Sequence, residues 1–444
     1  MKQDYLVTER PIKALATFAL PIIIGNLFQQ TYTMVDSAIV GQHVNEQALA
    51  AVGASYSLAN IFICIAIGGG MGASVIVSRY FGAHEYGKMK SAVYTALLSF
   101  LVISILLGGI GLLFSRRIMI LLNTPADVLD LSTTYLKIYF LGLPFLFMYN
   151  VVSAMFNALG KSRIPLCFLI FSSLFNVALD MLFVIRLHMG VSGVAWATLI
   201  AQGISVLMSF SMLLWEFRRI ESRCEKIFSF SELGRMTYVA LPSILQQSTV
   251  SIGMMLVQSV VNSFGSEALA GFSAAMRIEA ICIVPMAGIG NAVSSYTAQN
   301  IGADRKDRVI EGYHAALRLV GIFAIVILLV LEIFHTPIIT MFLGEDGTST
   351  ALSTGIRYLT FMGWFFCLIG LKMSVDGLLR GAGDMKMFTV ANLVNLSIRV
   401  LIAMTFAPRY GIAFVWYAVP VGWFANFAIS FAQYRTGKWR EIVR

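Results

Sequence analysis

Long apolar segments, each followed by a short polar one, repeat along this chain from one end to the other. Each segment is long enough to cross a bilayer as a helix, which needs about 20 residues. The apolar positions are continuous rather than alternating, so the pattern predicts helices and not the strands of a membrane barrel. We expect twelve spans, at residues 13–40, 47–78, 91–115, 127–158, 164–186, 191–217, 236–264, 267–298, 309–335, 349–379, 387–407 and 411–434.

The composition agrees with a chain that lies mostly in lipid. Of the 444 residues, 58% are hydrophobic and only 12% are charged, and the mean hydropathy is +0.79. A water-soluble domain of this length needs far more charge to cover its surface. Four of the five cysteines lie inside apolar segments, so we expect no disulfide and no metal site. The sequence therefore predicts an all-α integral membrane protein.

The basic residues predict how the chain is oriented. They stand in short clusters between the apolar segments, as the flanks of membrane spans do, so the net charge of +9 does not indicate a nucleic acid partner. With the N-terminus inside, the cytoplasmic segments hold 22 of the 32 Lys and Arg residues, the outer loops hold four, and six lie in spans. This bias predicts a multi-pass protein of the cell (inner or plasma) membrane with both termini cytoplasmic.

The two halves of the chain repeat each other. Residues 20–21 (Leu-Pro) recur as 241–242, and residues 48–50 (Ala-Leu-Ala) recur as 268–270. Six spans in each half give the halves the same topology, so an axis along the membrane normal relates them. Repeats of this kind place a cavity at their interface that rocking exposes to either side, although duplication for size alone is the alternative. We expect an N-terminal six-helix lobe at 1–217, a cytoplasmic linker at 218–235 and a C-terminal six-helix lobe at 236–444.

Acidic side chains deep in the spans of the first half are candidates for function, because an ionisable group in lipid is costly. Asp36 lies late in the first span, on one helix face with Gln29 and Thr33. Asp180 lies in the middle of the fifth span, four positions after Asn176 and on the same face. A carboxylate removed from water can bind and release a proton near neutral pH, and the same oxygens can coordinate Na⁺. The alternative is that each Asp only hydrogen-bonds a neighbouring helix.

The second half is less acidic at the matching places. Asp180 aligns with Arg399, and the seventh span carries a neutral polar stripe that includes Gln247 and Ser251. We therefore expect ion coupling in the N-terminal half, while Gln247 and Ser251, with Gln29 and Thr33, are candidates for a substrate cavity.

Four further residues in the spans are of interest. Glu279 is another candidate for the substrate cavity, although Arg277 beside it would neutralise its charge. For Asp376 and Arg380 we favour an i,i+4 pair near the cytoplasmic interface. Pro21 breaks a backbone hydrogen bond in the first span, so it permits that helix to bend and to act as a two-state element.

Motifs for enzymatic chemistry are absent from the sequence. It contains no phosphate loop, no dinucleotide fingerprint, no metal-spaced His or Cys and no nucleophile–base signature. We therefore expect a transporter rather than an enzyme, without a cofactor and driven by an ion gradient.

Short motifs spread over nearly the whole chain carry a family resemblance. They are A-L-P at 19–21, G-N-L-F-Q-Q at 25–30, V-D at 35–36, A-L-A-A-V-G at 48–53, R-Y-F-G-A at 79–83, N-A-L-G at 157–160, N-V-A-L-D at 176–180, E-A-L-A-G at 267–271, R-I-E at 277–279 and Q-N-I-G-A at 299–303. In this combination the sequence resembles the multidrug and toxic compound extrusion (MATE) family.

The resemblance implies a V-shaped exporter of two pseudo-symmetric six-helix bundles, which exchanges bulky cationic or amphipathic compounds for H⁺ or Na⁺. The bacterial branch with an acidic ion site in the N-terminal lobe matches Asp36, Asn176 and Asp180 here. The resemblance adds Thr198 to that ion site and makes Pro21 the bend of the first helix. We expect a monomer in the lipid bilayer.

Two other functions compete with this interpretation. A flippase for lipid-linked oligosaccharides, from the same superfamily, would take an anionic substrate, which Arg399 and Lys372 would suit. The acids of the first half and the absence of extra spans argue against it. A membrane enzyme or receptor would need a catalytic constellation or a sizeable soluble domain, and the sequence has neither.

Overall fold

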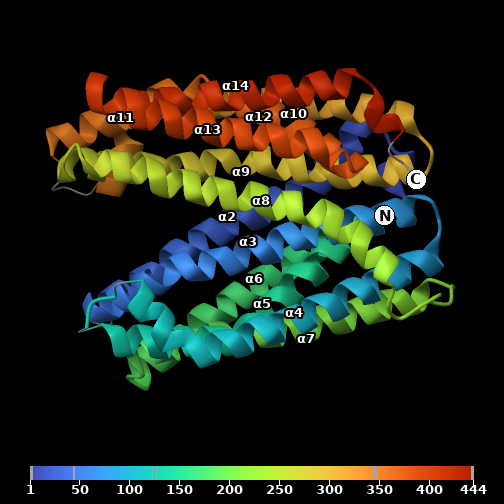
Figure 1. The fold of residues 1–444 in the computed structure, drawn as a ribbon, viewed down its shortest axis with the longest axis horizontal. Helices are drawn as coiled ribbons and strands as arrows, with labels where there is room; N and C mark the ends of the chain where they lie inside the picture. The colour runs from blue at the N-terminus through green and yellow to red at the C-terminus, as the bar shows by residue number, and fades with distance from the viewer. Residues whose placement is uncertain (1–3, 44–45, 123, 127, 344–347, 442–444) are drawn as a thin grey trace. The chain divides into compact units, whose positions relative to one another are not determined.

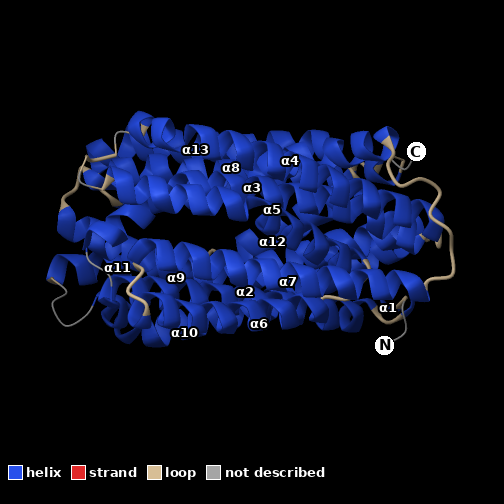
Figure 2. Ribbon diagram, turned by 90° about the horizontal axis from the view of Figure 1, so that it is seen from below, coloured by secondary structure: helices blue, strands red, loops and turns tan. Residues whose placement is uncertain are grey.

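The computed structural model describes residues 4–43, 46–122, 124–126, 128–343 and 348–441. Within those ranges, the side chains of residues 35–43, 46–51, 54, 56 and 57 are not described. Every regular element in the described ranges is a helix, as Figure 2 shows.

Twelve spans account for nearly all of this helix, as the sequence predicts. Eleven described helices are long and apolar enough to cross a membrane, and α11 with α12 completes a twelfth span. In the first half the spans are α2 (Pro11–His43), α3 (Glu46–Gly82), α4 (Tyr86–Leu121), α5 (Leu129–Ala158), α6 (Arg163–Asp180, continued by the π-helix η1, Met181–Arg186) and α7 (Gly190–Arg219) (Figure 1).

The second half follows the same order. Its spans are α8 (Phe230–Asn262), α9 (Ser266–Gly302), α10 (Lys306–Leu343), α11 (Ser349–Gly363) with α12 (Phe366–Ala382), α13 (Met385–Tyr410) and α14 (Ala413–Arg435). A short helix lies near each end of the chain, α1 (Tyr5–Thr8) and the 3₁₀-helix η2 (Lys438–Arg440). The all-α membrane architecture predicted from the sequence is confirmed.

One predicted span is not a single straight helix. The segment expected at 349–379 consists of α11 and α12, which are bent by 53° where they meet. At the break, the amide of Phe365 donates to the carbonyl of Met362 at 2.9 Å, three rather than four positions back. Gly363 ends α11 there, and glycine is a weak helix former, so its position favours the break.

The helices pack into two compact units, each described here by itself. The N-terminal unit is Ile24–Ile244, and the C-terminal unit combines Met1–Ile23 with Leu245–Arg444. In the N-terminal unit, α3, α4, α5 and α7 pack around a core that includes Phe81, Val93 and Phe156. In the C-terminal unit, α9 packs against α10, α11 and α12, and α14 packs against α12 and α13.

The boundaries between the units fall at equivalent points of two long helices. The division lies between Ile23 and Ile24 in α2, and between Ile244 and Leu245 in α8. Each point comes just after a proline inside the helix, Pro21 in α2 and Pro242 in α8. The lobe boundaries expected at 217 and 236 concern the sequence repeat and stay a prediction.

Small residues let α9 and α12 approach closely within the C-terminal unit. A Cβ at Gly377 would meet the backbone oxygen of Gly290, and one at Gly290 would come within 2.7 Å of the backbone oxygen of Met373. Helices in lipid gain no hydrophobic driving force for association, so close backbone packing of this kind has to hold them together. This packing fixes the helix that carries Lys372, Asp376 and Arg380.

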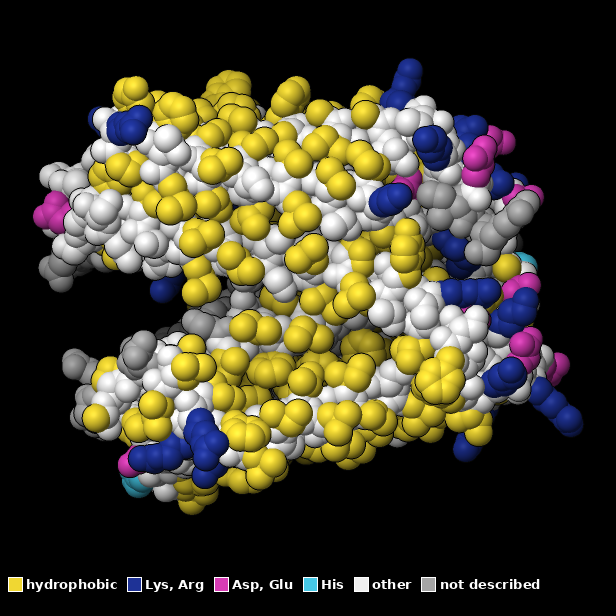
Figure 3. Space-filling model, in the orientation of Figure 1, with side chains coloured by type: hydrophobic (Ala, Val, Ile, Leu, Met, Phe, Trp, Pro, Cys, Tyr) yellow, Lys and Arg dark blue, Asp and Glu magenta, His cyan; other side chains and the backbone are white. Residues whose placement is uncertain are grey.

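The surface has the distribution expected of a membrane protein. On the face drawn in Figure 3, apolar side chains cover the flanks of the helices, and charged side chains gather at their ends. Exposed apolar side chains follow the outer faces of α4 and α10, with Leu106, Leu113, Ile325 and Ile333 all more than half exposed. Such flanks suit contact with lipid tails.

Candidate ion and substrate sites

A hydrogen-bonded polar cluster joins three helices of the N-terminal unit at Asn176. The hydroxyl of Tyr32 on α2 donates to Oδ1 of Asn176 on α6. The Nδ2 group of Asn176 donates to Oγ1 of Thr198 on α7 at 3.4 Å. Thr198 in turn donates to the carbonyl of Val194 on its own helix at 3.0 Å. The structure therefore brings two of the predicted ion-site residues, Asn176 and Thr198, into contact.

Asp180 lies one helical turn beyond Asn176, at the end of the α-helical part of α6. Its side chain has no exposed surface, and that of Asn176 is 2% exposed. The π-helical turn η1 begins at the next residue, and short π-helical segments in membrane and soluble helices are frequent at functional sites. The carboxylate of Asp180, the amide of Asn176 one turn earlier and the hydroxyl of Thr198 on α7 are oxygen ligands of the kind that a hard cation such as Na⁺ prefers.

Tyr32 is not among the site residues predicted from the sequence, although its position contains a signal. Tyr32 precedes Asp36 by four positions, so both share one face of α2. Asp36 itself lies on α2, but its side chain is outside the described residues, and its predicted role is not placed. Gln29 and Thr33 are exposed, and the Thr33 hydroxyl donates to the Gln29 carbonyl at 2.9 Å.

A second buried carboxylate, Glu279 on α9, lies in the C-terminal unit. It accepts a hydrogen bond from the hydroxyl of Tyr358 on α11 and is 5% exposed. The charge of Arg399 on α13 acts on both groups. Arg277, the alternative considered from the sequence, is two positions from Glu279, and residues at that spacing on a helix point to different faces.

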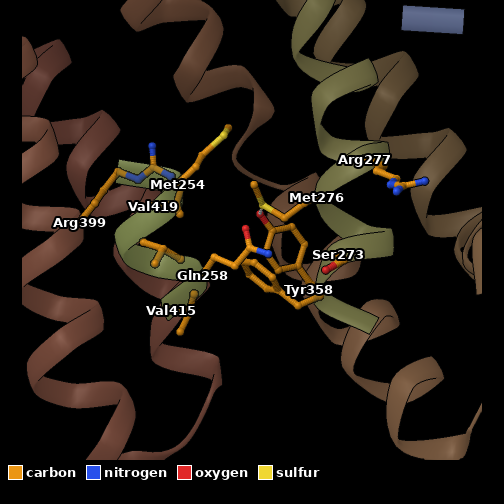
Figure 4. A pocket seen from close by; sticks show the side chains of 11 residues that line it. Met254, Gln258, Ser273, Met276, Arg277, Tyr358, Arg399, Val415 and Val419 are labelled. Atoms are coloured by element: carbon orange, nitrogen blue, oxygen red, sulfur yellow. Dashed lines mark hydrogen bonds between the residues drawn. The ribbon is translucent and has the colours of Figure 1, made fainter. Parts of the chain in front are cut away.

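A cavity of about 280 Å³ lies beside this buried carboxylate. Its wall includes Met254 and Gln258 from α8, Met276 from α9, Tyr358 and Arg399. In Figure 4, Arg399 lies on one side of the view, and Arg277 lies on the opposite side with its guanidinium turned away from Gln258 and Tyr358.

Two predicted cavity residues, Gln247 and Ser251, lie on α8 but are not in the wall of this cavity. Both are half-buried, and the Ser251 hydroxyl donates to the Gln247 carbonyl at 3.4 Å. The polar residue that α8 does place at the cavity is Gln258, two turns after Ser251 along the same stripe.

We expected Asp376 and Arg380 to pair with each other, but each has other partners in the structure. Asp376 forms an ion pair with Lys372, one turn earlier on α12, at 3.2 Å, and it accepts a hydrogen bond from Ser430 of α14 at 2.8 Å. Arg380, which is also near the charge of Asp376, donates to Asn291 of α9 at 2.9 Å. These groups are buried and connect α12 to α9 and α14, so their contacts support a structural role.

No cluster of three or more His, Cys, Asp or Glu side chains that could hold a transition metal occurs in the described part of the chain. The oxygen ligands of Asn176, Thr198 and Asp180 instead suit an alkali cation or, at the carboxylate, a proton.

Comparisons with known proteins agree with this architecture. The family model MatE matches residues 21–182 and 242–405, one match in each half. The probable multidrug resistance protein YpnP of Bacillus subtilis is 29% identical over 432 residues, which cover 97% of this chain and 96% of that protein. A protein of Shewanella oneidensis named as a FAD transporter is 23% identical and covers 77% of each chain.

Solved structures share the fold. A multidrug resistance MATE family transporter of the MOP superfamily in its outward-facing conformation superposes with a TM-score of 0.91, at 23% identity and 98% coverage of both chains. A MOP superfamily transporter from Pyrococcus furiosus, described as having a binding pocket of reverse polarity, gives the same TM-score at 22% identity and 99% coverage. Relatives named as multidrug resistance and export proteins do not favour the flippase alternative. The chain belongs to the MATE family of multi-pass membrane transporters.

Proposed function

We propose that this protein is a secondary exporter that exchanges bulky cationic or amphipathic organic compounds for H⁺ or Na⁺ by alternating access. It is not an enzyme in this proposal, and it uses no cofactor besides the coupling ion. It works as a monomer in the cell membrane, with both termini in the cytoplasm.

The cluster around Asn176 carries the proposal. Tyr32, Asn176 and Thr198 hydrogen-bond one another across α2, α6 and α7, and Asp180 is buried one turn away. A charged side chain in the middle of a span costs about 2.5–3.5 kcal/mol on insertion scales, so such a residue needs a compensating role. The coupling ion is bound by Asp36, Asp180, Asn176 and Thr198, and it neutralises this charge.

Pro21 gives the ion site a way to act on the rest of the protein. The proline lies inside α2, and the division between the compact units follows directly after it. Because proline removes one backbone hydrogen bond, α2 can bend there at a lower cost than elsewhere. Ion uptake by the part of α2 that holds Tyr32 and Asp36 favours the bend, and the bend lowers the affinity for the bound compound.

The substrate class follows from the relatives and from the cavity of the C-terminal unit. Several relatives are named as multidrug resistance or export proteins. Met254 and Met276, which line the cavity, have flexible side chains that adapt to ligands of different shape. Glu279 provides a carboxylate close to this cavity.

The proposal is tested by efflux from proteoliposomes loaded with a fluorescent lipophilic cation, with pH and Na⁺ gradients imposed separately. Efflux driven by one gradient, and lost in Asp36→Asn, is the expected result, and the gradient that works identifies the ion. If Asp36→Asn exports as fast as the parent protein under a full gradient, the proposed coupling is wrong.

A further inference from the structure

Arg399 is a positive charge in the middle of a membrane span. It occupies the centre of α13, and it is the counterpart of Asp180 in the sequence repeat. A charged group at this depth therefore marks a place where a counter-charge is expected.

The described residues do not provide Arg399 with a direct partner. No ion pair or hydrogen bond of its guanidinium occurs among them, and its Nε atom is buried without an acceptor. The carboxylate of Glu279 acts on it electrostatically but accepts its hydrogen bond from Tyr358. Arg399 thus lines the cavity with N–H groups that have no acceptor among the described residues.

The chemistry of the cavity wall indicates what would use that capacity. Besides Arg399, the wall includes the amide of Gln258, the hydroxyl of Tyr358 and the apolar side chains of Met254 and Val419. None of the acidic residues in the described chain lines it. A planar guanidinium binds a carboxylate through two parallel hydrogen bonds, and the methionines accept an aromatic or aliphatic body beside it.

We propose that Arg399 is the residue that binds the carboxylate of those amphipathic substrates that carry one. The inference rests on the proposed function, since it assigns a substrate-binding residue of the exporter. When the cavity holds no such compound, the carboxylate of Glu279, held by Tyr358, provides the counter-charge from a longer distance.

Two dyes separate this proposal from general binding of cations. Rhodamine 110 carries a free carboxyl group, and rhodamine 123 is its methyl ester with the same ring system. Their affinities for the purified protein in detergent can be measured by fluorescence polarisation, without an ion gradient. We expect Arg399→Gln to weaken rhodamine 110 binding about tenfold, because a charge-assisted pair is lost, and to change rhodamine 123 binding less than about twofold.

Two further variants control the result. Arg409→Gln removes the same charge from an exposed position at the end of α13 and is expected to leave both affinities unchanged. Arg399→Lys keeps the charge but loses the planar fork, and we expect it to weaken rhodamine 110 binding by about threefold. If Arg399→Gln does not fold, the rhodamine 110 affinity of Arg399→Lys tests the proposal instead.

Equal weakening of both dyes in Arg399→Gln, or of neither, would contradict the proposal, as would a parent protein that does not bind rhodamine 110. The proposed function fails by a separate result, namely that no gradient drives rhodamine 123 out of proteoliposomes. That result would leave the dye preference of the purified protein intact.

Discussion

The helices α6 and α13 occupy equivalent places in the two halves of the chain, yet they carry opposite charges. Asn176 and Asp180 on α6 correspond to Asn395 and Arg399 on α13, with the same spacing of four. The repeated backbone therefore keeps an amide in both halves and exchanges a carboxylate for a guanidinium one turn later. In the proposed assignment, one scaffold thus serves a cation in one half and an anion in the other.

A second pair of positions differs in the same way. In the N-terminal unit, the hydroxyl of Tyr139 on α5 donates to the backbone carbonyl of Ala59 on α3 at 3.1 Å. In the C-terminal unit, the hydroxyl of Tyr358 on α11 donates to the carboxylate of Glu279 on α9. The tyrosine joins equivalent helices in both halves, but only the second half adds an acid. This tyrosine contact between helices is therefore shared by the halves, whereas the polar group that accepts its hydrogen bond differs.

The largest effect is expected at the acid of the N-terminal unit. Asp180→Asn removes the charge that the coupling ion neutralises, so gradient-driven efflux should fall about a hundredfold, to the rate of passive leak. Initial rates of dye efflux from proteoliposomes measure this loss. Asp130→Asn is the matched control, because its carboxylate is 83% exposed and pairs with Arg116 outside the cluster. If Asp180→Asn still shows gradient-driven efflux, the ion site does not lie in the N-terminal half.

A smaller effect is expected at the prolines where α2 and α8 pass between the units. Pro21→Ala restores a backbone hydrogen bond in the helix that carries the ion site, so it should slow efflux about tenfold without weakening dye binding in detergent. Pro242→Ala makes the same change in α8, which carries no acid after its proline, and should slow efflux by about threefold. Equal slowing in both variants would mean that bending is not linked to the ion site.

The smallest effects are expected at two tyrosines, one in each unit. Tyr32→Phe removes the donor to Asn176, at a cost of about 1 kcal/mol, so the ion concentration for half-maximal efflux should rise about fivefold. Tyr358→Phe removes the donor to Glu279 and should change the affinity for rhodamine 110 while leaving the ion dependence unchanged. Ion titrations of efflux and dye-binding measurements in both variants check this difference. An altered ion dependence in Tyr358→Phe, with none in Tyr32→Phe, would contradict the assignment of ion coupling to the N-terminal unit.

The sequence predicted most of the fold because its signals are local. Apolar length and the positions of basic residues define spans one at a time, so all twelve were found, with boundary errors of up to eight residues at the end of α10. The break between α11 and α12 was missed because Gly363 is one glycine among 37, and nothing local distinguishes a glycine that ends a helix from one that packs against a neighbour.

The candidate sites were predicted less completely because side-chain partners depend on which helices approach each other. Helical spacing placed Asn176 and Asp180 on one face, but it could not show that Tyr32 from α2 would reach Asn176. Proximity in sequence likewise suggested Arg277 as the cation near Glu279, whereas the charge that acts on Glu279 is that of Arg399 on α13. Contacts across helices are the part of the site that a single sequence leaves open.

In the proposed division of work, the N-terminal unit couples to the ion and the C-terminal unit recognises the substrate anion. The direct measurement is the affinity of purified protein for rhodamine 123 as pH and Na⁺ concentration are varied, in the parent, in Asp180→Asn and in Arg399→Gln. We predict that the coupling ion weakens binding to the parent and to Arg399→Gln alike, and that Asp180→Asn binds the dye equally at every ion concentration. Ion dependence that persists in Asp180→Asn and disappears in Arg399→Gln would contradict the division.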